Sequence, residues 1–142
     1  MARAALEPRA DREVFTLPLA VKAEHIDANG HVNNVVYVGW LQDAGTAHWN
    51  HLFDAATRAR WSWVALRHEI DYLRPLPPGS RPVARTWVGD PQGPRFARFV
   101  RIEDEQGRLC AQGVSEWCLV DAASMRPHRI PPELLSPFVK AG

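Results

Sequence analysis

The sequence has no apolar stretch approaching the roughly 18 to 20 residues that a membrane-spanning helix needs. It also has almost no charge imbalance: its 142 residues include 17 Lys or Arg and 16 Asp or Glu, for a formal net charge of +1. It therefore lacks the basic surplus typical of nucleic-acid-binding domains. These absences favour a single domain of ordinary size that binds neither a membrane nor a nucleic acid.

Cysteine is scarce, and Cys110 and Cys118 are the only two. Both fall in one strand-like segment, where eight residues would separate them by roughly 26 Å. A disulfide requires Cα atoms within roughly 7 Å of each other, so no bridge between them is expected. Two reduced cysteines are typical of a reducing compartment, which favours a cytoplasmic protein.

The N-terminal stretch MARAALEPRADRE has neither the apolar middle of a secretory signal nor the acid-poor composition of a transit peptide, since it carries Glu7 and Asp11. We expect residues 1–12 to be a flexible lead-in and residues 13–142 to form one domain.

Strand-like and helix-like segments follow in a simple order. Residues 14–24 resemble a strand, with Pro18 favouring an edge or a bulge. Residues 33–52 have the period of a helix with a narrow polar stripe, so most of its surface should be covered. After a connection at 54–62 come four strand-like segments, joined mostly by short Pro- or Gly-rich turns: 63–76, 81–89, 95–104 and 108–121. This order predicts an α+β fold, with a long helix on one face of an antiparallel sheet.

The stretch that carries candidate chemistry is EHIDANGHVNNVVYVGW, residues 24–40, at the expected helix start. A helix start leaves about four backbone N–H groups unpaired at the positive end of the dipole, where they can stabilise an oxyanion. Gly30 would allow a tight turn, and Asn33 or a neighbour could cap the helix. Asp27 could attack a carbonyl held there, or take a proton from an attacking water. By pattern alone, an aspartate before a helix is more often a cap or turn residue.

The string DANGHVNNVVYVGW and the order of segments resemble the hotdog-fold thioesterases of the 4-hydroxybenzoyl-CoA thioesterase type. The D-x-N-x-H-V-N-N pattern is similar to that of plant acyl-ACP thioesterases. The stretches EIDYLRPLPPGS and SEWCLVDAASMRPHRIPPEL extend the likeness more loosely along the chain. The resemblance implies a hotdog fold, a five-stranded antiparallel sheet wrapped around one long central helix.

The resemblance also implies a catalytic site. Asp27 matches the family's catalytic carboxylate, and the backbone N–H of Asn34 matches the donor that polarises the thioester carbonyl. In the acyl-ACP branch, the residues that match Asn29 and His31 belong to the catalytic group as well. The implied activity is hydrolysis of an acyl-CoA to a carboxylic acid and a free thiol, with Asp27 as nucleophile or general base. Coenzyme A would enter as part of the substrate, and no cofactor or metal ion would be required.

The resemblance further implies a homodimer, joined edge to edge, with active sites at the subunit interface. Whether two dimers pair into a homotetramer is left open. An acyl-ACP thioesterase and a non-catalytic module that binds acyl thioesters are the alternative functions.

Other residues compete for roles in this site. Asp43, on the polar stripe of the helix, is a rival carboxylate because some hotdog thioesterases use an acidic residue there. His25 and His31 flank Asp27, but no third ligand stands at a convincing spacing, so no metal site is expected.

Arginine and tryptophan supply candidate substrate contacts. Arg95, Arg98 and Arg101 could hold the phosphates of coenzyme A, although solvated strand arginines are commoner. Trp61 and Trp63 could line an acyl pocket, although core packing is the usual role of a tryptophan.

Overall fold

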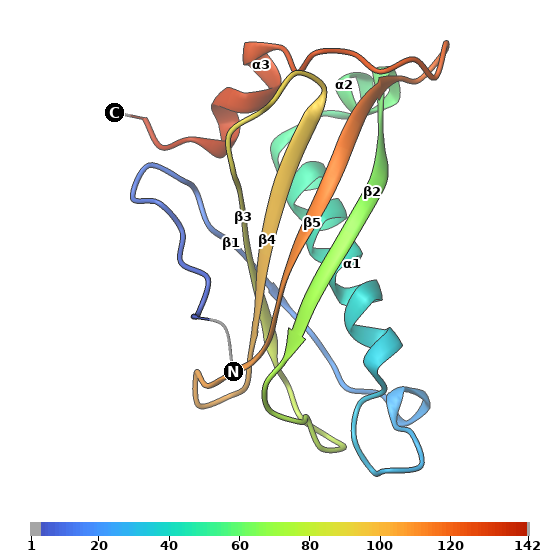
Figure 1. Cartoon of the computed structure of the whole chain (residues 1–142), viewed down its shortest axis with the longest axis vertical. Helices are drawn as coiled ribbons and strands as arrows, with labels where there is room; N and C mark the ends of the chain where they lie inside the picture. Colours follow the sequence, from blue (N-terminus) through green and yellow to red (C-terminus); the bar gives the residue numbers. More distant parts are fainter. Residues whose placement is uncertain (1–3, 142) are drawn as a thin grey trace.

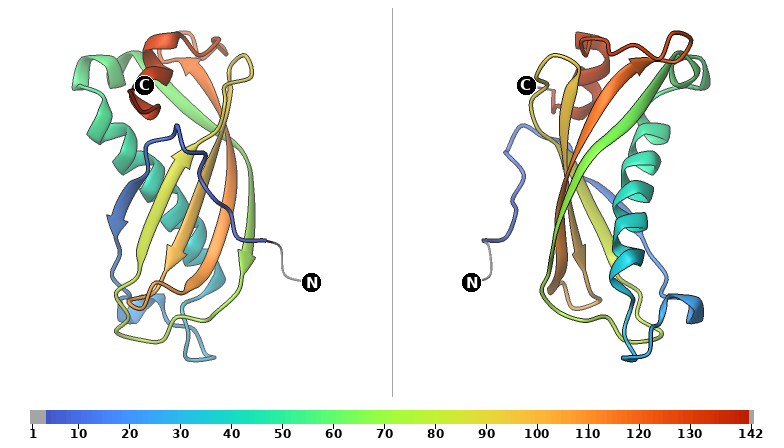
Figure 2. Two further views of the ribbon diagram at one scale, coloured as in Figure 1. Left: turned by 90° about the vertical axis from the view of Figure 1, so that its left-hand side faces the viewer. Right: turned by 45° about the vertical axis from the view of Figure 1, so that its right-hand side comes forward.

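The computed structural model describes residues 4–141. Within them, five strands form one antiparallel sheet in the order β1-β3-β4-β5-β2, and a long helix lies against one of its faces (Figures 1 and 2). The elements are β1 (Phe15–Pro18), η1 (Ala23–His25), α1 (Asn34–Leu52), α2 (Ala55–Arg60), β2 (Trp61–Tyr72), β3 (Val83–Val88), β4 (Arg95–Glu103), β5 (Leu109–Asp121), α3 (Pro132–Leu135) and η2 (Ser136–Phe138). The predicted α+β fold, a five-stranded sheet around a central helix, is confirmed.

Two local predictions were wrong. The first strand is shorter than 14–24, because β1 ends at Pro18, which has no N–H to donate to a ladder. The connection at 54–62 contains the short helix α2, which Asp54 caps by accepting a hydrogen bond from the Thr57 N–H at 2.8 Å. The aspartate before Ala-Ala-Thr-Arg-Ala-Arg is a local signal for the start of this helix, although a connection was predicted there.

The core lies between α1 and the inner face of the sheet. On β4, alternate residues Phe96, Val100 and Ile102 are buried, as the two-residue period of a strand requires. The helix comes very close to β5 at Gly113, where a Cβ atom would lie 2.5 Å from the side chain of Leu41. Burying each large apolar side chain in such a core contributes about 1.5–3 kcal/mol.

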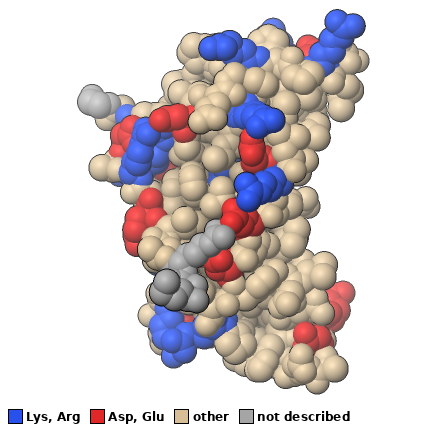
Figure 3. All heavy atoms as spheres, in the orientation of Figure 1, with Lys and Arg blue, Asp and Glu red and all other residues tan. Residues whose placement is uncertain are grey.

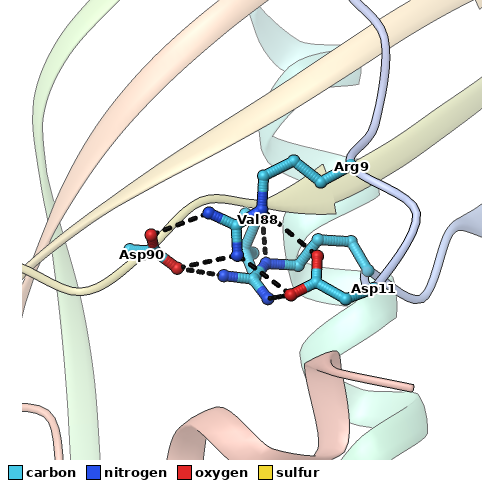
Figure 4. Close-up of polar contacts among 5 residues, drawn as sticks. Arg9, Asp11, Val88 and Asp90 are labelled. Carbon is cyan, nitrogen blue, oxygen red and sulfur yellow. Dashed lines mark hydrogen bonds and ion pairs between the residues drawn. The ribbon is translucent and has the colours of Figure 1, made fainter. Parts of the chain in front are cut away.

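The N-terminal segment crosses the outer face of the sheet, opposite α1 (Figure 2). Arg12 is buried there, and its Nε donates to the Val88 carbonyl at 3.0 Å while its guanidinium pairs with Asp90. Arg9 pairs with Asp90 at 2.8 Å and with Asp11 at 3.0 Å (Figure 4). The described part of the lead-in, residues 4–12, is thus tied to the turn that follows β3. Around it, the outer face carries interspersed positive and negative side chains (Figure 3).

The two edges of the sheet differ. The β1 edge has 4 residues and ends in a proline, whereas β2 has 12 residues and carries the exposed apolar side chains Val64 and Leu66. Val35, on the first turn of α1, is 75% exposed. None of the helices within residues 4–141 is long and apolar enough to cross a membrane.

Candidate active site

A tight hairpin leads into α1. Ile26 and Val32 form an antiparallel bridge, and the Asp27 N–H donates to the His31 carbonyl at 3.0 Å. The Gly30 N–H donates back to the Asp27 carbonyl at 3.0 Å, and Gly30 has a φ of 79°, the left-handed conformation that glycine adopts without strain. The turn at Gly30 expected from the sequence is therefore present.

Asp27 is half-buried in this hairpin. Its Oδ1 accepts a hydrogen bond from the Asn29 N–H at 2.9 Å, which is the turn-forming role expected of an aspartate here. Its Oδ2 has no hydrogen-bond partner within residues 4–141. The carboxylate is consequently fixed through one oxygen and free to react through the other.

The helix start lies at the base of the same hairpin. Asn33 caps α1, since its side chain accepts from the Val35 N–H at 2.9 Å while its own N–H donates to the His25 carbonyl at 2.8 Å. The Asn34 N–H, at the first helical position, has no hydrogen-bond partner in the described part of the chain. This leaves a polarised donor at the positive end of the helix dipole.

The structure places all four predicted site residues in the hairpin and the first helical residue. Asn29 and His31 are exposed, and the bonds that hold them in the turn are those of their backbones. The Asn34 side chain is also exposed. Asp43 lies nine residues along α1 from Asn34, which is roughly 13 Å at 1.5 Å per residue. It therefore does not belong to this cluster within one chain.

Tyr72 was not predicted to be part of the site. Its hydroxyl donates to the Asn34 carbonyl at 3.0 Å, and its ring meets that of Tyr37 edge-on at a centroid distance of 5.3 Å. The end of β2 thus holds the first turn of α1 in place. No sequence signal marks this contact, because 38 residues separate the two partners.

A cavity of about 80 Å³ lies between the second half of α1 and the inner face of the sheet. Its walls are largely aromatic: Trp49, Trp63, Phe96, Trp117 and Phe138. Of the two tryptophans singled out from the sequence, Trp63 lines this cavity, whereas Trp61 packs against His128 at a ring-centroid distance of 4.8 Å.

The three arginines of β4 do not act as one group. Arg98 points inward and is buried, because it lies two residues from both Phe96 and Val100, on the same face of β4. Arg95 pairs with Glu116 and Arg101 pairs with Glu103, on the opposite face. Within residues 4–141, no three His, Cys, Asp or Glu side chains are grouped so that they could hold a metal ion.

Residues 21–138 match the family model described as the thioesterase-like superfamily. The chain belongs to this superfamily. Its sheet order and its central helix are thus those of a hotdog-fold thioesterase, as the sequence resemblance implied.

Solved structures support the assignment of this thioesterase-like fold. The protein SAV2348 from Staphylococcus aureus, solved in complex with CoA, is 18% identical with a TM-score of 0.78 over 92% of this chain and 85% of its own. A DHNA-CoA thioesterase from the same organism is 17% identical with a TM-score of 0.77, over 88% of each chain. An acyl-ACP thioesterase from Bacteroides thetaiotaomicron is 17% identical with a TM-score of 0.78 over 91% of this chain, which spans 54% of that protein. No curated protein matches the sequence.

Proposed function

We propose that this protein is an acyl-CoA thioesterase, with Asp27 as nucleophile or general base. The observation that carries the proposal is one hairpin that presents a carboxylate with a free oxygen beside an unpaired helix-start N–H. In a chain of the thioesterase-like superfamily, this pair supplies both parts of an acyl-transfer site.

In the proposed reaction, the thioester carbonyl accepts a hydrogen bond from the Asn34 N–H. Asp27 either attacks the carbonyl carbon, forming an anhydride that water then opens, or removes a proton from a water that attacks directly. The negative charge that develops on the carbonyl oxygen lies at the positive end of α1. In both routes the C–S bond breaks, the thiolate takes a proton, and water supplies the oxygen of the carboxylate.

We further propose a homodimer formed by pairing the β2 edges of two chains. A long, exposed, proline-free edge with unpaired backbone groups is the kind of surface that pairs with another strand. Because α1 and β2 run in opposite directions along the same axis (Figure 1), a two-fold axis at the middle of β2 reverses one helix relative to the other. The hairpin of one subunit would then face the second half of α1 in its partner, where the aromatic cavity lies. Whether dimers pair into tetramers is not part of the proposal.

Coenzyme A is the proposed carrier. SAV2348, solved with CoA, and the DHNA-CoA thioesterase are matched over 85% and 88% of their own length, whereas this chain spans only 54% of the acyl-ACP thioesterase. We also propose a cytoplasmic location, which the two free, buried cysteines on β5 support.

The test is thiol release from a panel of short, long and aromatic acyl-CoAs by wild type and Asp27→Asn. The substitution keeps the size of the side chain and its hydrogen bond to Asn29 but removes the charge. We expect the wild type to hydrolyse at least one substrate and the variant to lose about two orders of magnitude in kcat.

Asp43→Asn serves as the matched variant. If it loses activity and Asp27→Asn does not, the catalytic carboxylate is on the helix, and our assignment is wrong. If the wild type binds acyl-CoAs without releasing thiol, the protein is a binding module, and the proposed hydrolysis is rejected.

A further inference from the structure

The aromatic cavity runs from the surface of α1 into the core. At its outer end lie Gln42 and Thr46, whose side chains are exposed on the helix. At its inner end lie Arg98, which is 8% exposed, and Phe138, which is 2% exposed. A group entering beside the helix would therefore meet a buried arginine at the bottom.

Among the described residues, the partners of the Arg98 guanidinium are neutral groups. Its Nη1 donates to the Thr86 hydroxyl at 3.0 Å and lies 3.1 Å from His48 Nδ1, and its guanidinium lies 5.7 Å from the centre of the Phe138 ring. No carboxylate forms an ion pair with Arg98 within residues 4–141, and none lines the cavity. A buried charge without a counter-charge is costly, so this position favours an anion.

His48 does not alter the net charge around Arg98. Burial, followed by the nearby charge of Arg98, lowers the pKa of His48 to about 3, so the ring is neutral and its Nδ1 can accept a hydrogen bond from Arg98 Nη1. Burial lowers the pKa of Arg98 to about 10, which still leaves the guanidinium charged at neutral pH.

Donor groups in the cavity remain unused. A guanidinium has five N–H donors, and in the described part of the chain only those on Nη1 of Arg98 have protein partners. The indole N–H of Trp117 is buried, has no hydrogen-bond partner among residues 4–141, and belongs to the same lining. Arg98 pairs with Ser115, and Trp117 pairs with Phe96, so the two donors are diagonal neighbours on the inner face.

Helix α1 has a glycine where it packs against Arg98. A Cβ atom on Gly45 would lie 3.1 Å from Arg98 Nε and 3.2 Å from its Cδ. A glycine at this position of α1 therefore leaves room for the guanidinium beneath the helix.

We propose that this cavity receives the far end of the acyl group, and that Arg98 selects acyl groups that end in a carboxylate. The preferred substrates are then the CoA thioesters of short dicarboxylic acids. A carboxylate would neutralise the buried charge and accept from the unused N–H donors, whereas a terminal methyl group would leave both unsatisfied. A volume of about 80 Å³ holds roughly five to eight water-sized groups, which limits the acyl chain to a short one. The inference rests on the proposed thioesterase activity and on the hairpin of the partner subunit reaching the mouth of the cavity.

The experiment compares glutaryl-CoA with pentanoyl-CoA, and adipyl-CoA with hexanoyl-CoA, pairs that differ in the terminal group. We expect the wild type to have the higher kcat/KM for the dicarboxylic member of each pair. In Arg98→Met, which keeps an unbranched apolar stem but removes the guanidinium and its charge, the ratio within each pair should fall by about tenfold to a hundredfold. A ratio measured within one protein does not depend on how much of the variant is folded.

Arg85→Met is the matched control, because Arg85 lies on the neighbouring strand β3, is 41% exposed and faces away from the cavity. Its ratios should equal those of the wild type. Arg98→Lys serves as a second variant in case Arg98→Met folds poorly. It keeps the charge and should retain part of the preference for the dicarboxylic substrates.

A wild type that prefers the monocarboxylic substrates, or a ratio unchanged by Arg98→Met, overturns the inference while leaving thioester hydrolysis intact. If no acyl-CoA is hydrolysed, the proposed function fails. The binding constants of the same CoA pairs, measured by calorimetry on wild type and Arg98→Met, then decide whether the carboxylate subsite exists.

Discussion

At the scale of single residues, the buried pair of Arg98 and His48 is the most unusual feature. A histidine that is 2% exposed keeps a neutral ring because burial and a neighbouring cation both oppose its protonation. In the unfolded chain the same ring is free to take up a proton near pH 6.5. This difference couples the stability of the protein to pH.

We predict that the free energy of unfolding decreases as the pH is lowered from about 6.5 toward the folded pKa of about 3. In this window the unfolded state binds the proton and the folded state does not, so acid favours unfolding by up to about 1.4 kcal/mol per pH unit. Urea unfolding at pH 6.5, 5.5 and 4.5 measures the slope. His48→Gln, which retains an acceptor for Arg98, should flatten it.

The exposed His128 provides the comparison for this experiment. His128→Gln should show the slope of the wild type, because it removes an exposed ring and leaves the buried His48 in place. If His48→Gln and the wild type give the same slope, His48 is not the group that titrates.

At the scale of elements, two adjacent asparagines at the start of α1 have different roles. Asn33 caps the helix with its side chain, whereas the proposed contribution of Asn34 is its backbone N–H. A proline at the first helical position is compatible with an α-helix, since the N–H there has no intrahelical partner. Asn33, with φ −62° and ψ 141°, already has the extended conformation required of a residue before proline.

We predict that Asn34→Pro lowers kcat by about 10²- to 10³-fold, because it deletes the donor to the oxyanion while keeping the helix. Asn34→Ala, which keeps the N–H, should lose much less. Steady-state kinetics on both variants, with circular dichroism to check the helix, measure the difference. Equal losses in the two variants would show that the side chain, and not the backbone donor, is what matters.

At the scale of the whole molecule, the exposed surface is uneven. Val35 on α1 and the apolar side chains Val64 and Leu66 on β2 are exposed in the single chain. Leu66 lies at the bulge in the middle of β2, where a two-fold axis would pass in the proposed dimer. A charge placed there would be buried against its own copy.

We predict that Leu66→Asp shifts the protein from dimer to monomer and removes most of the thioesterase activity, since each proposed site uses two chains. Sedimentation velocity at equal concentrations measures the assembly. Met125→Asp is the control, because Met125 in the turn after β5 is also an exposed apolar residue, 57% accessible against 47% for Leu66. A wild type that sediments as a monomer would contradict the proposed interface.

The sequence by itself determined the order of the long helix and the five strands, the helix boundary near Asn33 and the tight turn at Gly30. These depend on local interactions: periodicity, capping and the conformational freedom of glycine. The short helix α2 had an equally local signal in Asp54, and its omission was an error of interpretation. The two-residue period of β4 is a similar local signal, because it places Arg98 on the buried face with Phe96 and Val100, but the three arginines were grouped as possible phosphate contacts.

Only the tertiary structure decided what Arg98 meets there. The sequence placed it with Arg95 and Arg101 as a candidate for phosphate binding, but its partners His48 and Thr86 come from elements 50 and 12 residues away. The contact of Tyr72 with Asn34 and the space that Gly45 leaves are decided in the same way. Such contacts arise from packing between distant segments, which local propensity does not encode. The fold can therefore be predicted from the sequence, whereas the chemistry of the cavity depends on how the core is packed.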